Sequence, residues 1–111
     1  MITIGYCTKN IDPKFQDYIS NSCGIKNVEV IPFENPGTHS LTEAYNIILN
    51  KASNDIVILC HDDIRVKTKK WGQKIINHFS NTDYGIIGVA GTYYYPESGR
   101  WWENPQTMVG Q

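Results

Sequence analysis

Apolar and polar residues alternate in blocks along residues 1–91, and each block has the length of one strand or one helix. Short runs rich in β-branched and aromatic residues, which are typical of strands, occur four times. The third run shows no polar alternation, a pattern typical of a parallel strand covered on both faces. The four runs are ITIGYC (residues 2–7), VEVIPF (28–33), DIVILC (55–60) and YGIIGVAG (84–91).

The segments between these runs carry apolar residues at helical spacing, and each has a candidate capping residue. The caps are Asp12 before Pro13 for a helix over residues 13–22, Ser40 with Glu43 in capping-box spacing for a second helix, and Thr68 for a third. Single helices between strands predict right-handed crossovers. The fold class expected is therefore α/β: a doubly wound, Rossmann-like three-layer α/β/α sandwich with a mostly parallel sheet of about four strands.

After Gly91 this pattern stops, because residues 92–111 are irregular, aromatic and proline-containing. We therefore expect an α/β domain over residues 1–91 and an irregular aromatic tail over 92–111. Trp101 and Trp102 in this tail have faces suited to stacking on sugar rings. Packing of the same aromatic side chains against another part of a longer protein explains them equally well.

The composition describes an ordinary globular protein, with 41% hydrophobic and 19% charged residues and a net charge of −1. It lacks the basic field with which nucleic-acid-binding proteins attract phosphate, so no nucleic-acid partner is expected. No apolar run approaches the roughly 20 residues that span a bilayer, and no signal peptide follows Met1. We expect a cytoplasmic protein without a transmembrane segment; peripheral membrane association and oligomeric state stay open. Three widely spaced cysteines favour free thiols over a disulfide framework or a zinc site.

The third apolar run leads directly into His61, Asp62 and Asp63. In doubly wound sheets, ligands bind beyond the carboxyl ends of the strands. A third strand beside the first, with the second strand on the other side, would place this triplet opposite Thr8 and Lys9, with Glu34 in the same crevice. Two adjacent carboxylates favour a hard divalent cation, Mg²⁺ or Mn²⁺, completed by water and phosphate oxygens.

Two alternatives apply to the residues around this acidic pair. Asp62 and Asp63 can also be turn formers that end a strand without any metal. His61 suits Mn²⁺ better than Mg²⁺, so its part in a metal site is less secure. The basic run that follows is more typical of a solvated segment than of a phosphate site; it comprises Arg65, Lys67, Lys69 and Lys70.

Four segments together resemble the N-terminal, nucleotide-sugar-binding half of a family 2 type glycosyltransferase with a GT-A fold. These segments are ITIGYCTKN, SLTEAYNIILNKAS, NDIVILCHDDI and the stretch from WGQKIINHF to YGIIGVAGTYYYPESGRWWE. The family's third strand ends in an Asp-x-Asp type motif. His61 replaces the first acid here, as in a His-x-Asp variant subgroup of glycosyltransferase-like proteins.

This resemblance implies roles for individual residues. Asp63 would be the metal ligand, Asp62 would lie near the ribose, and Glu34 would accept from the uracil imide. Thr8 and Lys9 would border the base pocket, and Asn46 would belong to the nucleotide-binding set.

The resemblance also implies an activity: transfer of a glycosyl group from a nucleotide diphosphate sugar, with a UDP-sugar expected, to a carbohydrate or other acceptor. Family enzymes take their catalytic base from an acceptor-binding half, for which residues 92–111 would be only the start. Two readings stay open, an enzyme as part of a longer chain and a non-catalytic nucleotide-sugar-binding or interaction module. A response-regulator type phosphoacceptor domain is disfavoured, because the first strand ends in Thr8, Lys9 and Asn10 rather than in acids.

Overall fold

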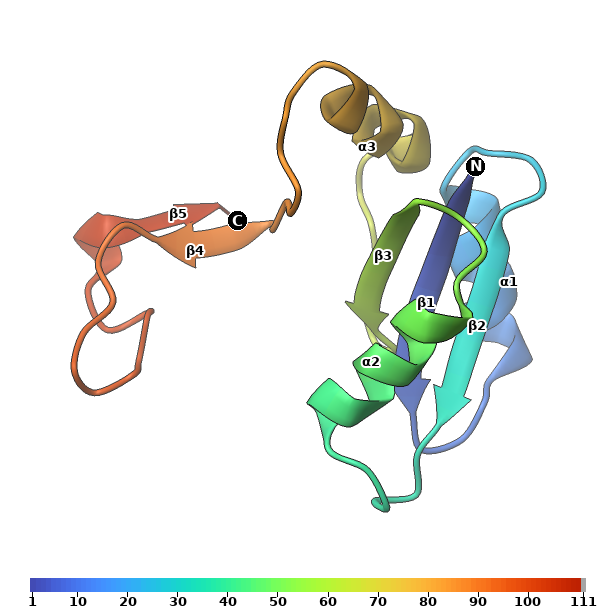
Figure 1. Ribbon diagram of the computed structural model, residues 1–111, viewed down its shortest axis with the longest axis horizontal. Coiled ribbons are helices and arrows are strands. Elements are labelled where there is room, and N and C mark those ends of the chain that lie inside the picture. Colours follow the sequence, from blue (N-terminus) through green and yellow to red (C-terminus); the bar gives the residue numbers. More distant parts are fainter. Residues whose placement is uncertain (111) are drawn as a thin grey trace. The chain divides into compact units, whose positions relative to one another are not determined.

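The computed structural model describes residues 1–110 and divides the chain into two compact units, residues 1–81 and the residues from 82 on (Figure 1). The first unit contains strands and helices in the order β1-α1-β2-α2-β3-α3. The expected α/β class is therefore confirmed.

A parallel sheet with the strand order β2-β1-β3 forms the centre of the first unit. It consists of β1 (Ile2–Thr8), β2 (Glu29–Glu34) and β3 (Ile56–His61). In register, Thr8 lies beside Glu34 and Cys7 lies beside His61, so the carboxyl ends of all three strands meet at one edge. The strand order assumed from the sequence is confirmed.

Helices cover both faces of this sheet, as expected. They are α1 (Pro13–Ser22), α2 (Leu41–Lys51) and α3 (Trp71–Ser80). In Figure 1, α2 lies in front of the sheet and α1 behind it. One face of β1 contributes its buried side chains to a core shared with α1 and the start of α3; this core contains Ile2, Ile4, Tyr6, Phe15, Ile19, Cys23 and Trp71.

Two of the three predicted helix caps are confirmed. The side chain of Asp12 accepts a hydrogen bond from the Lys14 amide at 2.9 Å, and Ser40 and Glu43 form a complete capping box. Each of these caps depends on residues that are close together in the chain.

The predicted cap at Thr68 is wrong. The N-cap of α3 is Lys70, which has a left-handed backbone (φ 52°) and no side-chain capping bond. The start of α3 is held instead by the end of α1. The Gly72 amide donates to the Cys23 carbonyl at 3.0 Å, and Trp71 Nε1 donates to Ser22 Oγ at 3.1 Å.

The expected fourth parallel strand over residues 84–91 is also wrong. Within the described residues, the parallel sheet has three strands, and residues 84–89 belong to none. Ile86 and Val89 are 92% and 85% exposed. The reason is that an apolar run records hydrophobicity but not the presence of a pairing partner. The unit boundary lies at 81/82, whereas the sequence pattern placed it at 91/92.

β3 is also less buried than the sequence pattern predicts. In the described part of the chain it pairs with β1 alone, so it is an edge strand. Leu59 is 37% exposed, although the run was expected to be covered on both faces.

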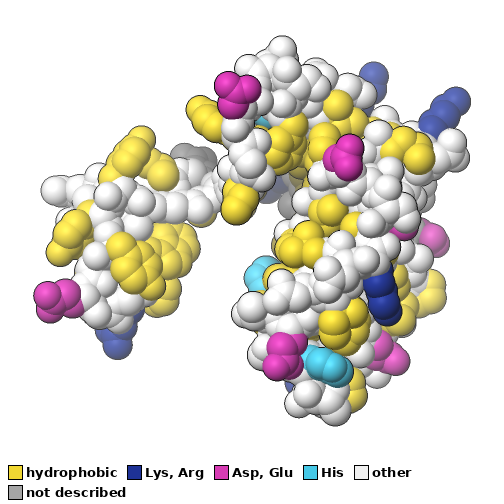
Figure 2. All heavy atoms as spheres, viewed as in Figure 1, with side chains coloured by type: hydrophobic (Ala, Val, Ile, Leu, Met, Phe, Trp, Pro, Cys, Tyr) yellow, Lys and Arg dark blue, Asp and Glu magenta, His cyan; other side chains and the backbone are white. Residues whose placement is uncertain are grey.

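The second unit is built on a small antiparallel pair, β4 (Ala90–Thr92) and β5 (Met108–Gly110), with the 3₁₀ helix η1 (Pro105–Thr107) before β5. Thr92 Oγ1 lies 3.0 Å from Thr107 Oγ1, and the Tyr93 amide donates to the Thr107 carbonyl. Hydrophobic side chains gather on the surface of this unit (Figure 2). Throughout residues 1–110, each helix is too short or too polar to cross a lipid bilayer.

Candidate functional site

An open hollow of about 500 Å³ lies at the carboxyl ends of β1 and β3. Three of its lining residues, Thr8, Lys9 and Asp62, were expected at the site from the sequence. They come together because adjacent parallel strands end at the same edge of the sheet. The other lining residues are Cys7, Asn35 and Gly37.

Thr8 holds the carboxylate of Asp62. Thr8 is the last residue of β1 and is 7% exposed, and its Oγ1 lies 2.7 Å from Asp62 Oδ2. The Asn10 carbonyl is a second acceptor at 2.9 Å, and the single hydroxyl proton serves one acceptor at a time. A hydrogen bond to a carboxylate is stronger than one between neutral groups, so the bond to Asp62 fixes that side chain at the rim of the hollow.

The charge of Asp62 also acts on neighbouring groups. Burial, and then the Asp62 carboxylate, raise the pKa of the Cys60 thiol to about 11. Burial is likewise the largest cause that raises the pKa of Tyr6, followed by the charges of Cys60, Asp12 and Asp62. Ionisation of the Cys60 thiol or the Tyr6 hydroxyl is therefore disfavoured, mainly because these groups are buried and secondarily because Asp62 is negatively charged.

The remaining acidic residues and His61 do not line the hollow. His61 and Asp63 are exposed, and Asp63 lies in the turn after β3. Glu34 ends β2 beside Thr8, and its Oε1 accepts from the Ile11 amide at 3.4 Å. Asn46 is exposed on α2 and is likewise not a lining residue.

The donor set limits the kind of metal site that fits. Across residues 1–110, no group of three or more His, Cys, Asp and Glu residues is arranged to hold a metal ion. A zinc site or a calcium cage built wholly from protein is therefore not supported. Mg²⁺ is commonly held by one or two carboxylates, with water and substrate phosphates as the other ligands, so the number and chemistry of the carboxylates at Asp62 and Asp63 are compatible with such a site.

The segment after the carboxylates is fastened to α1. The Val66 amide donates to the Tyr18 hydroxyl at 2.8 Å, and the Arg65 guanidinium lies 4.7 Å from the centre of the Tyr18 ring. Arg65 is thus engaged in a cation–π contact. The other basic residues of the run are exposed, as expected for a solvated segment; they are Lys67, Lys69 and Lys70.

Sequence reasoning missed Cys7, Asn35 and Gly37. The sequence indicates only that Cys7 is a free thiol. Asn35 and Gly37 lie in the segment ENPG, which directly follows the second apolar run VEVIPF. The signal for Gly37 was available, because glycine after proline is typical of a turn that needs a positive φ, and its φ is 105°.

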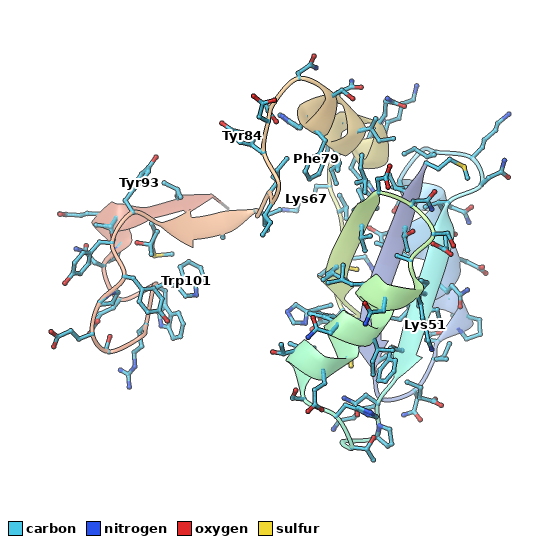
Figure 3. The ribbon with its side chains drawn as sticks, viewed as in Figure 1. Lys51, Lys67, Phe79, Tyr84, Tyr93 and Trp101 are labelled. Atoms are coloured by element: carbon cyan, nitrogen blue, oxygen red, sulfur yellow. The ribbon has the colours of Figure 1, made fainter. Side chains whose placement is uncertain are left out.

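The second unit carries the aromatic residues expected to meet sugars. The ring centroids of Trp101 and Trp102 are 5.8 Å apart at an interplanar angle of 89°. Trp102 is 56% exposed and Tyr93 is 87% exposed. Figure 3 labels Tyr93 and Trp101 in the segment that connects β4 to η1.

The sequence model of the glycosyltransferase-like family matches residues 18–111. This chain belongs to the glycosyltransferase-like family. The match includes the acidic residues after β3 and the loop that contains Asn35 and Gly37, whereas β1 lies before it. No curated protein and no solved structure matches the chain. Membership in the glycosyltransferase-like family indicates a sugar donor and a glycosyl acceptor as partners.

Proposed function

We propose that this glycosyltransferase-like domain binds a nucleotide diphosphate sugar, with a UDP-sugar as donor, for transfer of the glycosyl group to an acceptor. The observation that carries the proposal is the Asp62 carboxylate, held by Thr8 at the carboxyl edge of a parallel sheet. This edge is where doubly wound folds bind nucleotides. Lys9 brings a positive side chain to the same hollow.

In this proposal, Asp63 binds Mg²⁺ or Mn²⁺ and Asp62 lies toward the ribose. A metal held there would neutralise negative charge on the nucleoside diphosphate. His61 joins the ligand set when the metal is Mn²⁺, as a His-x-Asp variant of the family motif. This assignment requires Asp63, which is exposed, to turn its carboxylate toward the phosphates.

The nucleoside has its own proposed contacts. Thr8 and Lys9 border the base, and Glu34 accepts from the uracil imide once its contact with the Ile11 amide, 3.4 Å long, is released. Asn46 contributes from α2. The proposed location is the cytoplasm, where nucleotide sugars are available to such a domain.

The acceptor is proposed to stack on Trp101 and Trp102, because aromatic faces pack on the C–H faces of sugar rings. The base that deprotonates the acceptor hydroxyl is expected outside this chain. Of the described residues that line the hollow, Asp62 is the one acid, and it is already committed to the donor. This observation favours donor binding without turnover as a second candidate function for the first unit.

Calorimetric titration of UDP tests donor binding. With Mn²⁺ we expect binding that is at least tenfold tighter than without metal, and Asp63→Asn should abolish this difference. The matched control is Asp55→Asn, which removes an exposed carboxylate directly before the first residue of β3, at the end of the strand away from the hollow. Equal binding with and without metal, or an Asp63→Asn variant that binds like the wild type, would refute the metal assignment.

Release of UDP from a UDP-sugar separates the two candidate functions. Incubation of the chain with donor, Mn²⁺ and simple sugar acceptors should release UDP if the domain turns over. Release of UDP would exclude donor binding without turnover, whereas metal-dependent binding without release would show that this chain alone binds the donor and does not transfer the sugar.

A further inference from the structure

The loop between β2 and α2 is organised by one side chain. Asn35 Oδ1 accepts hydrogen bonds from three successive backbone amides, those of Gly37, Thr38 and His39, at 3.1, 3.1 and 3.2 Å. Asn35 Nδ2 donates to the His39 carbonyl at 2.8 Å. The loop is thereby folded around the Asn35 amide.

The backbone of Asn35 joins this loop to the central strand. Its amide donates to the Thr8 carbonyl at 2.7 Å, directly beyond the last paired residues of β1 and β2. Thr8 is also the residue whose hydroxyl meets Asp62. Hydrogen bonds made by the carbonyl and the hydroxyl of Thr8 therefore connect the loop, the end of β1 and the Asp62 carboxylate.

The loop has few other restraints. Residues 36–39 are all exposed, and Gly37 adopts a positive φ of 105°. The edge-to-face contact between Phe33 and His39, with ring centroids 5.4 Å apart, is its one aromatic packing interaction among the described residues. Without the Asn35 side chain, three backbone amides would lose their acceptor and the loop would exchange among conformations.

The side chain of Asn35 has little capacity left for a ligand. Its oxygen already accepts three hydrogen bonds, and one of its two amide hydrogens is used. Asn35 and Gly37 nevertheless both line the hollow. The amide side chain is therefore suited to holding the wall of the hollow in place.

We infer that Asn35 is a positioning residue for nucleotide binding, which fixes the loop of residues 35–39 so that Asn35 and Gly37 line the same hollow as Asp62. This inference rests on the proposed function. It assigns to Asn35 an effect on nucleotide affinity that is transmitted by the loop backbone.

The test combines amide exchange with UDP binding, both measured on the full chain in the presence of Mn²⁺. Asn35→Ala should speed hydrogen exchange at the amides of Gly37, Thr38 and His39 and weaken UDP binding at least tenfold. Asn35→Asp keeps the acceptor oxygen for the same amides, and should restore slow exchange and recover part of the lost affinity. Asn50→Ala, an exposed asparagine on α2 outside the hollow, is the matched control and should behave like the wild type.

The outcomes separate this inference from the proposed function. If the wild type binds no UDP, the proposed function fails and the positioning role fails with it. If the wild type binds UDP and Asn35→Ala binds equally well, the positioning role alone is overturned. Unchanged exchange at the three amides in Asn35→Ala would overturn it as well, whatever the affinity.

Discussion

Replacing Gly5 by alanine tests the close contact between β1 and α2 beneath the candidate site. A β-carbon at Gly5 would lie 2.2 Å from Ile48 Cγ2, and 3.4 Å from both Ile48 Cβ and Leu59 Cδ2. Non-bonded carbons pack at about 3.5–4.0 Å, so the first contact needs a displacement of about 1.3 Å. Ile48 is fully buried and β-branched, with one preferred side-chain rotamer in a helix, so it cannot turn away.

The expected loss of stability follows from two opposing effects. Overpacking of a well-packed core costs about 1–3 kcal/mol. The narrower unfolded ensemble of alanine relative to glycine offsets about 0.4–1 kcal/mol. Because Ile48 cannot turn away from the added methyl group, the overpacking cost lies in the upper half of that range, about 2–3 kcal/mol. After the offset, we expect Gly5→Ala to lower the free energy of unfolding by about 1–2.6 kcal/mol.

A double-mutant cycle identifies Ile48 as the cause. Ile48→Ala alone should lower the free energy of unfolding by about 2–5 kcal/mol, because it leaves a cavity. In the double variant the methyl group of residue 5 occupies part of that cavity. The combined loss should therefore be smaller than the sum of the single losses by about 1 kcal/mol or more.

The assay is urea unfolding followed by far-ultraviolet circular dichroism, for the wild type, both single variants and the double variant. Gly85→Ala is the control, because its added β-carbon meets no atom within 4 Å, and its stability should stay within about 0.5 kcal/mol of the wild type. A Gly5→Ala variant as stable as the wild type, or strictly additive energies in the cycle, would refute the close approach of α2 to β1.

Three further predictions concern single side chains. Thr8→Val keeps the shape of the side chain but removes the hydrogen-bond donor to Asp62. The affinity for UDP in the presence of Mn²⁺ should therefore fall about tenfold, equivalent to about 1.4 kcal/mol, while the free energy of unfolding measured in urea stays nearly unchanged. Equal UDP affinity of the variant and the wild type in calorimetry would contradict this role of Thr8. Hydrogen bonds from Thr3 and then Ser53 lower the pKa of Glu29 below its ordinary 4.5, so the wild type should lose stability as pH falls through the folded-state pKa. The Glu29→Gln variant should lose less stability than the wild type between about pH 6 and pH 3. If the unfolding midpoints of the two proteins fall equally with pH over this range, the linkage is disproved. With a pKa of about 11, roughly one Cys60 thiol in a thousand is ionised at about pH 8, so Cys60 should resist iodoacetamide in the native protein. Rapid alkylation of Cys60, detected by peptide mass spectrometry, would contradict this protection by burial.

Local signals in the sequence were enough for most of the first unit. The caps at Asp12 and Ser40 depend on hydrogen bonds between residues at most three positions apart, so they could be predicted directly. The meeting of Thr8, Lys9 and Asp62 followed from parallel strands that end at one edge.

The features that the sequence did not predict depend on distant contacts. The start of α3 is set by two hydrogen bonds, from Trp71 to Ser22 and from Gly72 to Cys23, and Ser22 lies 49 positions before Trp71 in the chain. These distant bonds override the capping signal at Thr68. The run from Tyr84 to Val89 has the composition of a buried strand, but composition does not specify a partner. The part played by Asn35 arises from a loop that folds back on one side chain, which has no periodic signature.

The segment from Asp62 to Val66 is held at both ends, so the number of residues in it affects the geometry of the candidate site. Asp62 is bonded to Thr8 and the Val66 amide is bonded to Tyr18, so both ends of this short stretch have fixed positions. An extra residue between them would have to break one of these bonds, whereas an insertion at the exposed residues 67–69 could loop outward into water. The number of residues that separate Asp62 from Val66 therefore determines where the carboxylate stands, as much as its chemical identity does.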